Sequence, residues 1–142
     1  MKSFSEKWVI IFLFIGLILF SCMDGWGEDW EKHGESDKMF LYYDAGSLTR
    51  PSKDVVRVRG KLIFKVKGIA EMVEEFGKKY ETLSHSLNVI ELHCAEKKIR
   101  RLSFVYYSAD GNVLGSGQSP EEKWSIIPPD SVGESLYKIL CK

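Results

Sequence analysis

The sequence predicts an α+β domain in which an antiparallel sheet of about five or six strands packs with two helices. Three observations predict this fold class. Apolar and charged residues alternate along 55–66, apolar residues recur at helical spacing along 68–83, and an Asp-Gly pair at 110–111 separates two β-prone segments. The roughly 120 residues that follow residue 21 are enough for one hydrophobic core and too few for two.

The first predicted elements are short and β-prone. A strand at 29–33 is only weakly indicated, because the segment around it is polar and rich in turn-forming residues. The run MFLYYD at 39–44 predicts a second strand, which the turn at 45–47 ends. Residues 51–54 predict another break.

The clearest strand is 55–66. Its alternation places Val56, Val58 and Leu62 on one face and basic residues on the other, as expected for a half-buried antiparallel strand. Gly60 takes one of the inward positions, which indicates a bulge or the close packing of a helix.

An amphipathic helix is predicted at 68–83. Its apolar residues recur on one helix face: Ile69, Met72, Val73, Phe76 and Tyr80. Gly77 would lie in the middle of this helix at a cost of about 1 kcal/mol, so we expect a packing reason for it.

The second half of the chain predicts a meander and a terminal helix. Strands at 87–94, 100–108 and 113–118 are separated by turns and should pair antiparallel. The helix begins at the capping box Ser131-x-x-Glu134 and carries an apolar stripe to the C-terminus.

The N-terminus has the layout of a bacterial lipoprotein signal. Basic residues precede about 13 apolar residues, and Ser21-Cys22 follows them. We therefore predict a signal peptide at 1–21, lipidation of Cys22, a tether at 22–27 and a folded domain at 28–142. Cleavage with release and an uncleaved anchor are the alternatives, although a spanning helix needs about 20 apolar residues.

Two further cysteines remain, Cys94 and Cys141. If Cys22 carries lipid, one disulfide between these two occupies every thiol of an exported chain. Closing this loop of about 47 residues would stabilise the fold by on the order of 3–4 kcal/mol and pin the terminal helix onto a strand. Two free, buried cysteines are the alternative.

Composition argues against several classes of function. The formal net charge is +0, which disfavours a general nucleic-acid binder. His33, His85 and His93 lack metal-ligand spacing, and no catalytic motif stands out, so neither a metal site nor an enzyme is predicted. No cofactor is predicted, with haem on a single histidine as a minor alternative.

Basic residues suggest a binding patch. Those of strand 55–66 and those after position 96 could meet across the sheet and bind a sulfated polysaccharide or an acidic protein. The candidates are Arg57, Arg59, Lys61, Lys65, Lys97 and Arg101. A solvated sheet face is the alternative. The tyrosine pairs at 42–43 and 106–107 should each place one ring on each face of the sheet.

A set of motifs follows in a fixed order: Tyr42-Tyr43-Asp44, Ser84-x-Ser86-Leu87, Cys94, Tyr106-Tyr107 before Asp110-Gly111, Trp124 with Ile127-Pro128-Pro129, and Ser131-Val132-Gly133-Glu134 before Cys141-Lys142. Through this set, residues 26–142 resemble the bacterial surface-adhesin protein E-like family. The resemblance implies a surface-exposed outer-membrane lipoprotein with an antiparallel sheet and a C-terminal helix. The best-known member binds host extracellular-matrix proteins and is associated with haem binding, but no ligand-binding motif can be matched here.

Two functional hypotheses follow. The first is a lipid-anchored, surface-exposed lipoprotein that acts as a non-catalytic adhesion module toward an extracellular partner. The second is a periplasm-facing lipoprotein that holds an envelope complex together, with haem or small-ligand carriage as a minor third. The resemblance and an exposed sheet edge also suggest a homodimer.

Overall fold

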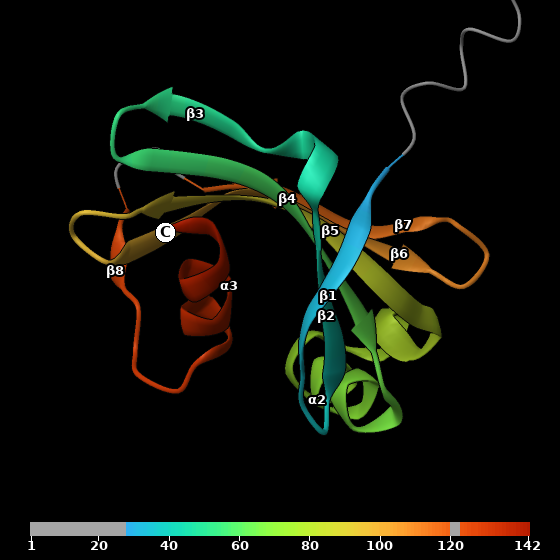
Figure 1. Cartoon of the computed structure of the whole chain (residues 1–142). Helices are drawn as coiled ribbons and strands as arrows, with labels where there is room; N and C mark the ends of the chain where they lie inside the picture. The colour runs from blue at the N-terminus through green and yellow to red at the C-terminus, as the bar shows by residue number, and fades with distance from the viewer. Residues whose placement is uncertain (1–27, 120–122) are drawn as a thin grey trace, which may run out of the picture.

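The computed structural model describes residues 28–119 and 123–142 (Figure 1). The predicted signal peptide at 1–21, the lipidation site Cys22 and the tether at 22–27 lie outside the described residues. In chain order the elements are β1 (Trp30–Glu35), β2 (Met39–Asp44), a 3₁₀ turn (Ala45–Ser47), β3 (Thr49–Ser52), β4 (Val55–Phe64), α2 (Val66–Phe76), a second 3₁₀ segment (Lys78–Thr82), β5 (Leu83–His93), β6 (Lys98–Ser108), β7 (Val113–Gln118), β8 (Ser125–Ile126) and α3 (Val132–Leu140). Among these elements, no helix combines the length and the apolar character that crossing a membrane requires.

The strands form one antiparallel sheet in the order β1-β2-β4-β5-β6-β7. The predicted α+β class is confirmed, but the described residues form eight strands rather than five or six. The additional strands are β3, which pairs with β4, and β8, which pairs with β6. Pro51 lies within β3, and a proline is tolerated there because an edge strand has one side without ladder hydrogen bonds.

Both helices lie on the same side of the sheet (Figure 1). We call this side the inner face and the opposite side the outer face. Under α3, the inner face forms the main core of Tyr43, Val56, Val58, Leu92, Ile127, Leu136 and Leu140. At the other end, α2 and the 3₁₀ segment after it bring Tyr80 against Tyr106, with ring centroids 5.7 Å apart.

A disulfide joins Cys94 and Cys141, as predicted, with an S–S distance of 2.04 Å. Cys94 follows β5 and Cys141 follows α3, so the bond ties the end of the last helix to a central strand. The Tyr137 hydroxyl donates a hydrogen bond of 2.8 Å to the Cys94 carbonyl, which adds a second contact at the same end of the helix.

The predicted capping box is half present. Ser131 Oγ accepts a hydrogen bond of 3.2 Å from the Glu134 amide, which caps α3. The Glu134 carboxylate pairs instead with Lys97 at 3.0 Å and with Lys138 at 3.1 Å. This buried carboxylate therefore links α3 to the turn between β5 and β6.

The helix predicted at 68–83 is in fact two elements. Gly77 has a φ of 102°, which residues with a Cβ rarely adopt. Gly77 therefore ends α2 instead of lying in its middle, which corrects the expectation of a continuous helix. The 3₁₀ segment that follows turns Tyr80 into the protein interior.

Gly60 faces inward, as predicted, but it does not mark a bulge. Its partners Tyr43 and Asn88 continue a regular register with β2 and β5. The nearest neighbour that a Cβ at Gly60 would meet is Ile90 Cδ1, at 3.1 Å.

Candidate binding face

The outer face of the sheet lies opposite both helices, which leaves it uncovered by either of them (Figure 1). The antiparallel register places alternate residues of β2, β4, β5 and β6 on this face. These side chains include charged and aromatic residues together with the aliphatic residues Ile63, Leu87, Val89 and Val105. The outer face is therefore the candidate site for contact with a partner.

Glu91 is the buried centre of an ion-pair cluster on the outer face. Its side chain is 1% exposed because arginines from both neighbouring strands enclose it. Arg57 of β4 donates from Nε at 3.1 Å, and Arg100 of β6 donates from Nε at 2.8 Å. The Trp124 ring lies over the Arg100 guanidinium at 4.3 Å. The cluster crosses three strands and fixes both guanidinium groups.

Asp44 anchors a second ion pair at the end of β2. Its carboxylate accepts hydrogen bonds of 3.0 Å from the amides of Asp29 and Gly46, and it pairs with Arg59. Burial alone would raise the pKa of Asp44, but the Asp29 amide and Arg59 outweigh this and lower the pKa. The carboxylate therefore stays charged and holds Arg59 on the outer face.

Lysine ammonium groups lie over aromatic rings along β1 and β2. Lys61 lies 5.5 Å from the centroid of the Trp30 ring. Lys65 and Lys32 lie 4.4 Å and 4.8 Å from the centroid of the Phe40 ring. Such contacts contribute about 0.5–1 kcal/mol at exposed sites. This part of the outer face therefore presents cations and aromatic rings together.

The tyrosine pairs divide between the two faces as predicted. Tyr43 is buried on the inner face, and its neighbour Tyr42 pairs with Lys61 on the outer face. Tyr106 packs inward against Tyr80, while Tyr107 stacks on His85 with centroids 5.1 Å apart. One half-buried tyrosine from each pair is thus available on the outer face.

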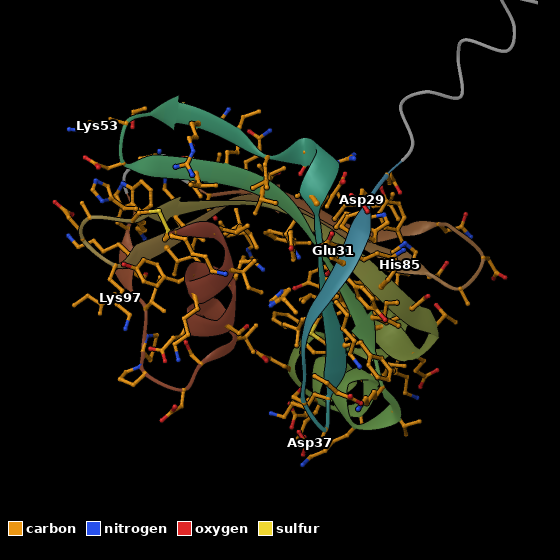
Figure 2. The ribbon with its side chains drawn as sticks, viewed as in Figure 1. Asp29, Glu31, Asp37, Lys53, His85 and Lys97 are labelled. Carbon is orange, nitrogen blue, oxygen red and sulfur yellow. A yellow bond between two sulfur atoms is a disulfide. The ribbon has the colours of Figure 1, made fainter. Side chains whose placement is uncertain are left out.

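The six predicted patch residues do not lie together. Arg57, Arg59, Lys61 and Lys65 lie on or beside β4 and share the outer face. Lys97 lies in the turn before β6 and pairs with Glu134, and Figure 2 places it beside α3, far from His85. Arg101 lines a hollow on the inner face with Ile90 and Leu136.

A bulge explains the position of Arg101. The register between β5 and β6 passes from Ser103 directly to Arg101 and skips Leu102. Beyond this bulge, successive residues exchange faces, so Arg100 points outward and Arg101 inward. Assigning every second residue of β6 to the same face of the sheet does not take this bulge into account, so it places Arg100 and Arg101 on the wrong faces.

Sequence reasoning also missed the acidic partners of the basic residues. Glu91 pairs with Arg57, Asp44 with Arg59, and Glu35 with Lys65 at 2.6 Å. The signal available in the sequence was Glu91, an acid within an otherwise apolar run beside the basic strand. The outer face is therefore a mosaic of ion pairs rather than a uniformly positive surface.

The three histidines lie apart. His33 Nδ1 is 2.9 Å from Ser135 Oγ, His85 stacks on Tyr107, and His93 lies edge-on to Trp124. Among the described residues no group of three or more His, Cys, Asp or Glu is placed to hold a metal ion. Haem binding through a single histidine stays a prediction.

Comparison with known families decides the identity of the domain. The family model described as surface-adhesin protein E matches residues 30–142, which is most of the chain. The chain belongs to the surface-adhesin protein E family. Comparison with curated proteins and with solved structures gives no significant match.

Membership of the surface-adhesin protein E family confirms the resemblance found in the sequence motifs. The matched range begins at the first residue of β1 and ends at the last residue of the chain. It therefore includes both helices, the disulfide and the whole outer face. The family description points to a role in adhesion at the cell surface.

Proposed function

We propose that this member of the surface-adhesin protein E family is a lipoprotein anchored through Cys22. It binds an extracellular protein and does not catalyse a reaction on it. The family match supports the adhesive role. The apolar run and Ser21-Cys22 of the N-terminus support the lipid anchor. The uncovered outer face is the observation that carries the proposal, since it supplies a broad contact surface.

The outer face has the chemistry of a protein contact surface. Aromatic residues and arginine are enriched at interfaces, because they bury a large area and also form hydrogen bonds. Here Trp30, Phe40 and Tyr107 supply the rings, and their rotamers are restrained by cations and by His85. A face whose side chains are already ordered loses less entropy when it binds.

Charge on this face favours a partner with carboxylates. Arg57 and Arg59 are half exposed although each is paired with an acid. Within the described residues Lys61 has its Trp30 contact but no ion pair. A partner carboxylate near Lys61 would gain a charge pair without displacing an existing one. We therefore propose an acidic protein surface rather than a sulfated polysaccharide, which would meet a largely neutralised patch.

Two measurements on cells test the anchor and the location. The mass of the mature N-terminal peptide should correspond to a lipidated Cys22, and a peptide that begins elsewhere contradicts the anchor. Protease treatment of intact cells should digest the domain if it faces outward. A domain that is digested only after the outer membrane is opened would instead support the periplasm-facing alternative.

A homodimer through a sheet edge stays a prediction. β1 and β7 form the two ends of the main strand order, and each pairs on one side only among the described strands. Sedimentation of the lipid-free domain measures the oligomeric state directly. If the protein is a monomer at all concentrations, the predicted homodimer is contradicted. The proposal that the outer face is the contact surface is unaffected by that result.

A further inference from the structure

The inner face has an open groove between the part covered by α3 and the part covered by α2. It holds about 300 Å³, which is at the lower limit for small-molecule sites. The walls and floor are largely apolar: Met39, Leu41, Leu62, Ile90, Ile99 and Leu136. This groove lies on the opposite side of the sheet from the proposed contact surface.

A glycine helps to create the groove. Gly60 lies on the floor at the centre of β4, where the flanking inward positions carry Val58 and Leu62. A Cβ at this position would lie 3.1 Å from Ile90 Cδ1, closer than ordinary van der Waals contact. A larger side chain would fill the groove or displace Ile90.

A buried amide on the floor lacks a hydrogen-bond partner. Asn88 is 5% exposed and lines the groove. Its Nδ2 has one long contact of 3.4 Å to Ser86 Oγ, and its Oδ1 has no partner among the described residues. The oxygen and nitrogen of an amide can be exchanged by rotation, and either choice leaves one polar atom unpartnered. A hydroxyl both donates and accepts, so it would satisfy either orientation.

A cation lies at the rim. Arg101 lines the groove, is exposed, and stacks on Phe104 at 4.3 Å. No ion pair to Arg101 is present within 28–119 and 123–142. His33 also lines the groove, and burial lowers its pKa, so it is neutral at neutral pH. Arg101 therefore sets the sign of the charge that the rim attracts.

We propose that the groove binds a small aromatic carboxylic acid that carries a hydroxyl at the end remote from the carboxylate. The hydroxyl pairs with Asn88, the ring packs on Ile90, and the carboxylate pairs with Arg101. Diagonal neighbours on adjacent strands are about 7–8 Å apart, which is a span that a phenyl ring with a short side chain can cover. A rigid ring also loses little conformational freedom when it binds.

The test uses 3-(4-hydroxyphenyl)propionate as the probe on the wild-type domain, followed by NMR of the isoleucine and leucine methyl groups. We expect saturable shifts at groove residues. The analogue without the hydroxyl, 3-phenylpropionate, should bind at least tenfold more weakly, since Asn88 would stay unpartnered. Tyramine, which has an ammonium group in place of the carboxylate, should produce no saturable shift. Equal binding of all three compounds, or no shift with any of them, overturns the proposal.

Variants give a second line of evidence. Asn88→Leu should abolish hydroxyl discrimination while raising the melting temperature, because it removes an unpartnered buried amide. Asn112→Ala, in the exposed turn before β7, is the matched control and should leave binding unchanged. Arg101→Gln should weaken the probe about tenfold, whereas Arg50→Gln on the exposed strand β3 should not. If neither Asn88→Leu nor Arg101→Gln changes the affinity for the probe, the assignment of these two residues to the binding site is contradicted. If a variant fails to fold, the comparison of the three compounds on the wild-type protein tests the proposal instead.

Discussion

The inner face of the sheet buries Val58 and Leu92 beneath α3, whereas the outer face holds Glu91 of β5 between arginines of the two neighbouring strands, β4 and β6. The two faces differ in what orders their side chains. Apolar packing and a disulfide order the inner face, and ion pairs and cation–π contacts order the outer face. The comparison indicates that stability comes chiefly from the inner face, while the outer face keeps polar groups ordered and accessible for contact.

The largest expected effect is on the inner face. Leu92 is 0% exposed, so Leu92→Ala should lower the free energy of unfolding by about 3–5 kcal/mol through lost burial and a cavity. Val66→Ala is the control, because Val66 is 85% exposed, and it should change stability by no more than about 0.5 kcal/mol. Urea titration of both variants measures the difference. Similar losses in the two variants would contradict the proposed division between core and surface.

The disulfide should have the next largest effect. Replacing Cys94 and Cys141 together with alanine should cost about 3–4 kcal/mol, mainly because the unfolded chain gains freedom. Thermal melting of the double variant beside the oxidised wild type measures this cost. Proteolysis should also begin near α3, which the disulfide ties to β5. A double variant with an unchanged melting temperature would mean that packing alone fixes the helix.

The Glu91 cluster should contribute less than the inner core. Glu91→Gln should cost about 1–3 kcal/mol, since it weakens hydrogen bonds to two charged groups that can still reach water. Glu96→Gln provides a control with an exposed acid that, among residues 28–119 and 123–142, pairs only with Lys98, and its effect should be close to zero. Chemical denaturation compares the two. A Glu91→Gln loss as large as that of Leu92→Ala would make the outer face equally important for stability.

The smallest expected effect is a pH dependence at α3. Lys97 and then Lys138 hold the pKa of Glu134 at about 2, below its ordinary 4.5. Because the folded pKa is the lower one, this stabilisation is fully present above about pH 4.5 and is lost as the pH falls toward 2. The melting temperature of the wild type should therefore fall more steeply over this range than that of Glu134→Gln. Parallel curves for the two proteins would contradict the role assigned to Glu134.

Local patterns in the sequence predicted most of the sheet. Strands at 39–44 and 113–118 have the predicted bounds, since alternation and turn residues determine them directly. The helix end at Gly77 was missed because the helical spacing of apolar residues continues past this glycine. The positive φ of Gly77 is set by the turn that follows it, which the spacing does not reveal. β8 was missed because a two-residue strand forms only when β6 is already in place beside it.

Side-chain partners were harder to predict than strands. The basic residues of β4 were placed correctly on one face, but the carboxylates that pair with them come from β1, β2 and β5. Arg101 was assigned to the same patch because the bulge at Leu102 leaves no signature in composition. The unpartnered amide of Asn88 likewise emerges only when three strands are assembled.

Adhesion of intact cells tests the central claim most directly. Cells that display the wild-type chain, the outer-face variant Trp30→Ala with Lys61→Ala, or the control Arg50→Gln would be applied to an immobilised extracellular-matrix protein, after equal surface levels are established. We predict that the outer-face variant loses at least tenfold in adhesion while the control retains it. Wild-type adhesion in the outer-face variant would contradict the assignment of the outer face as the contact surface.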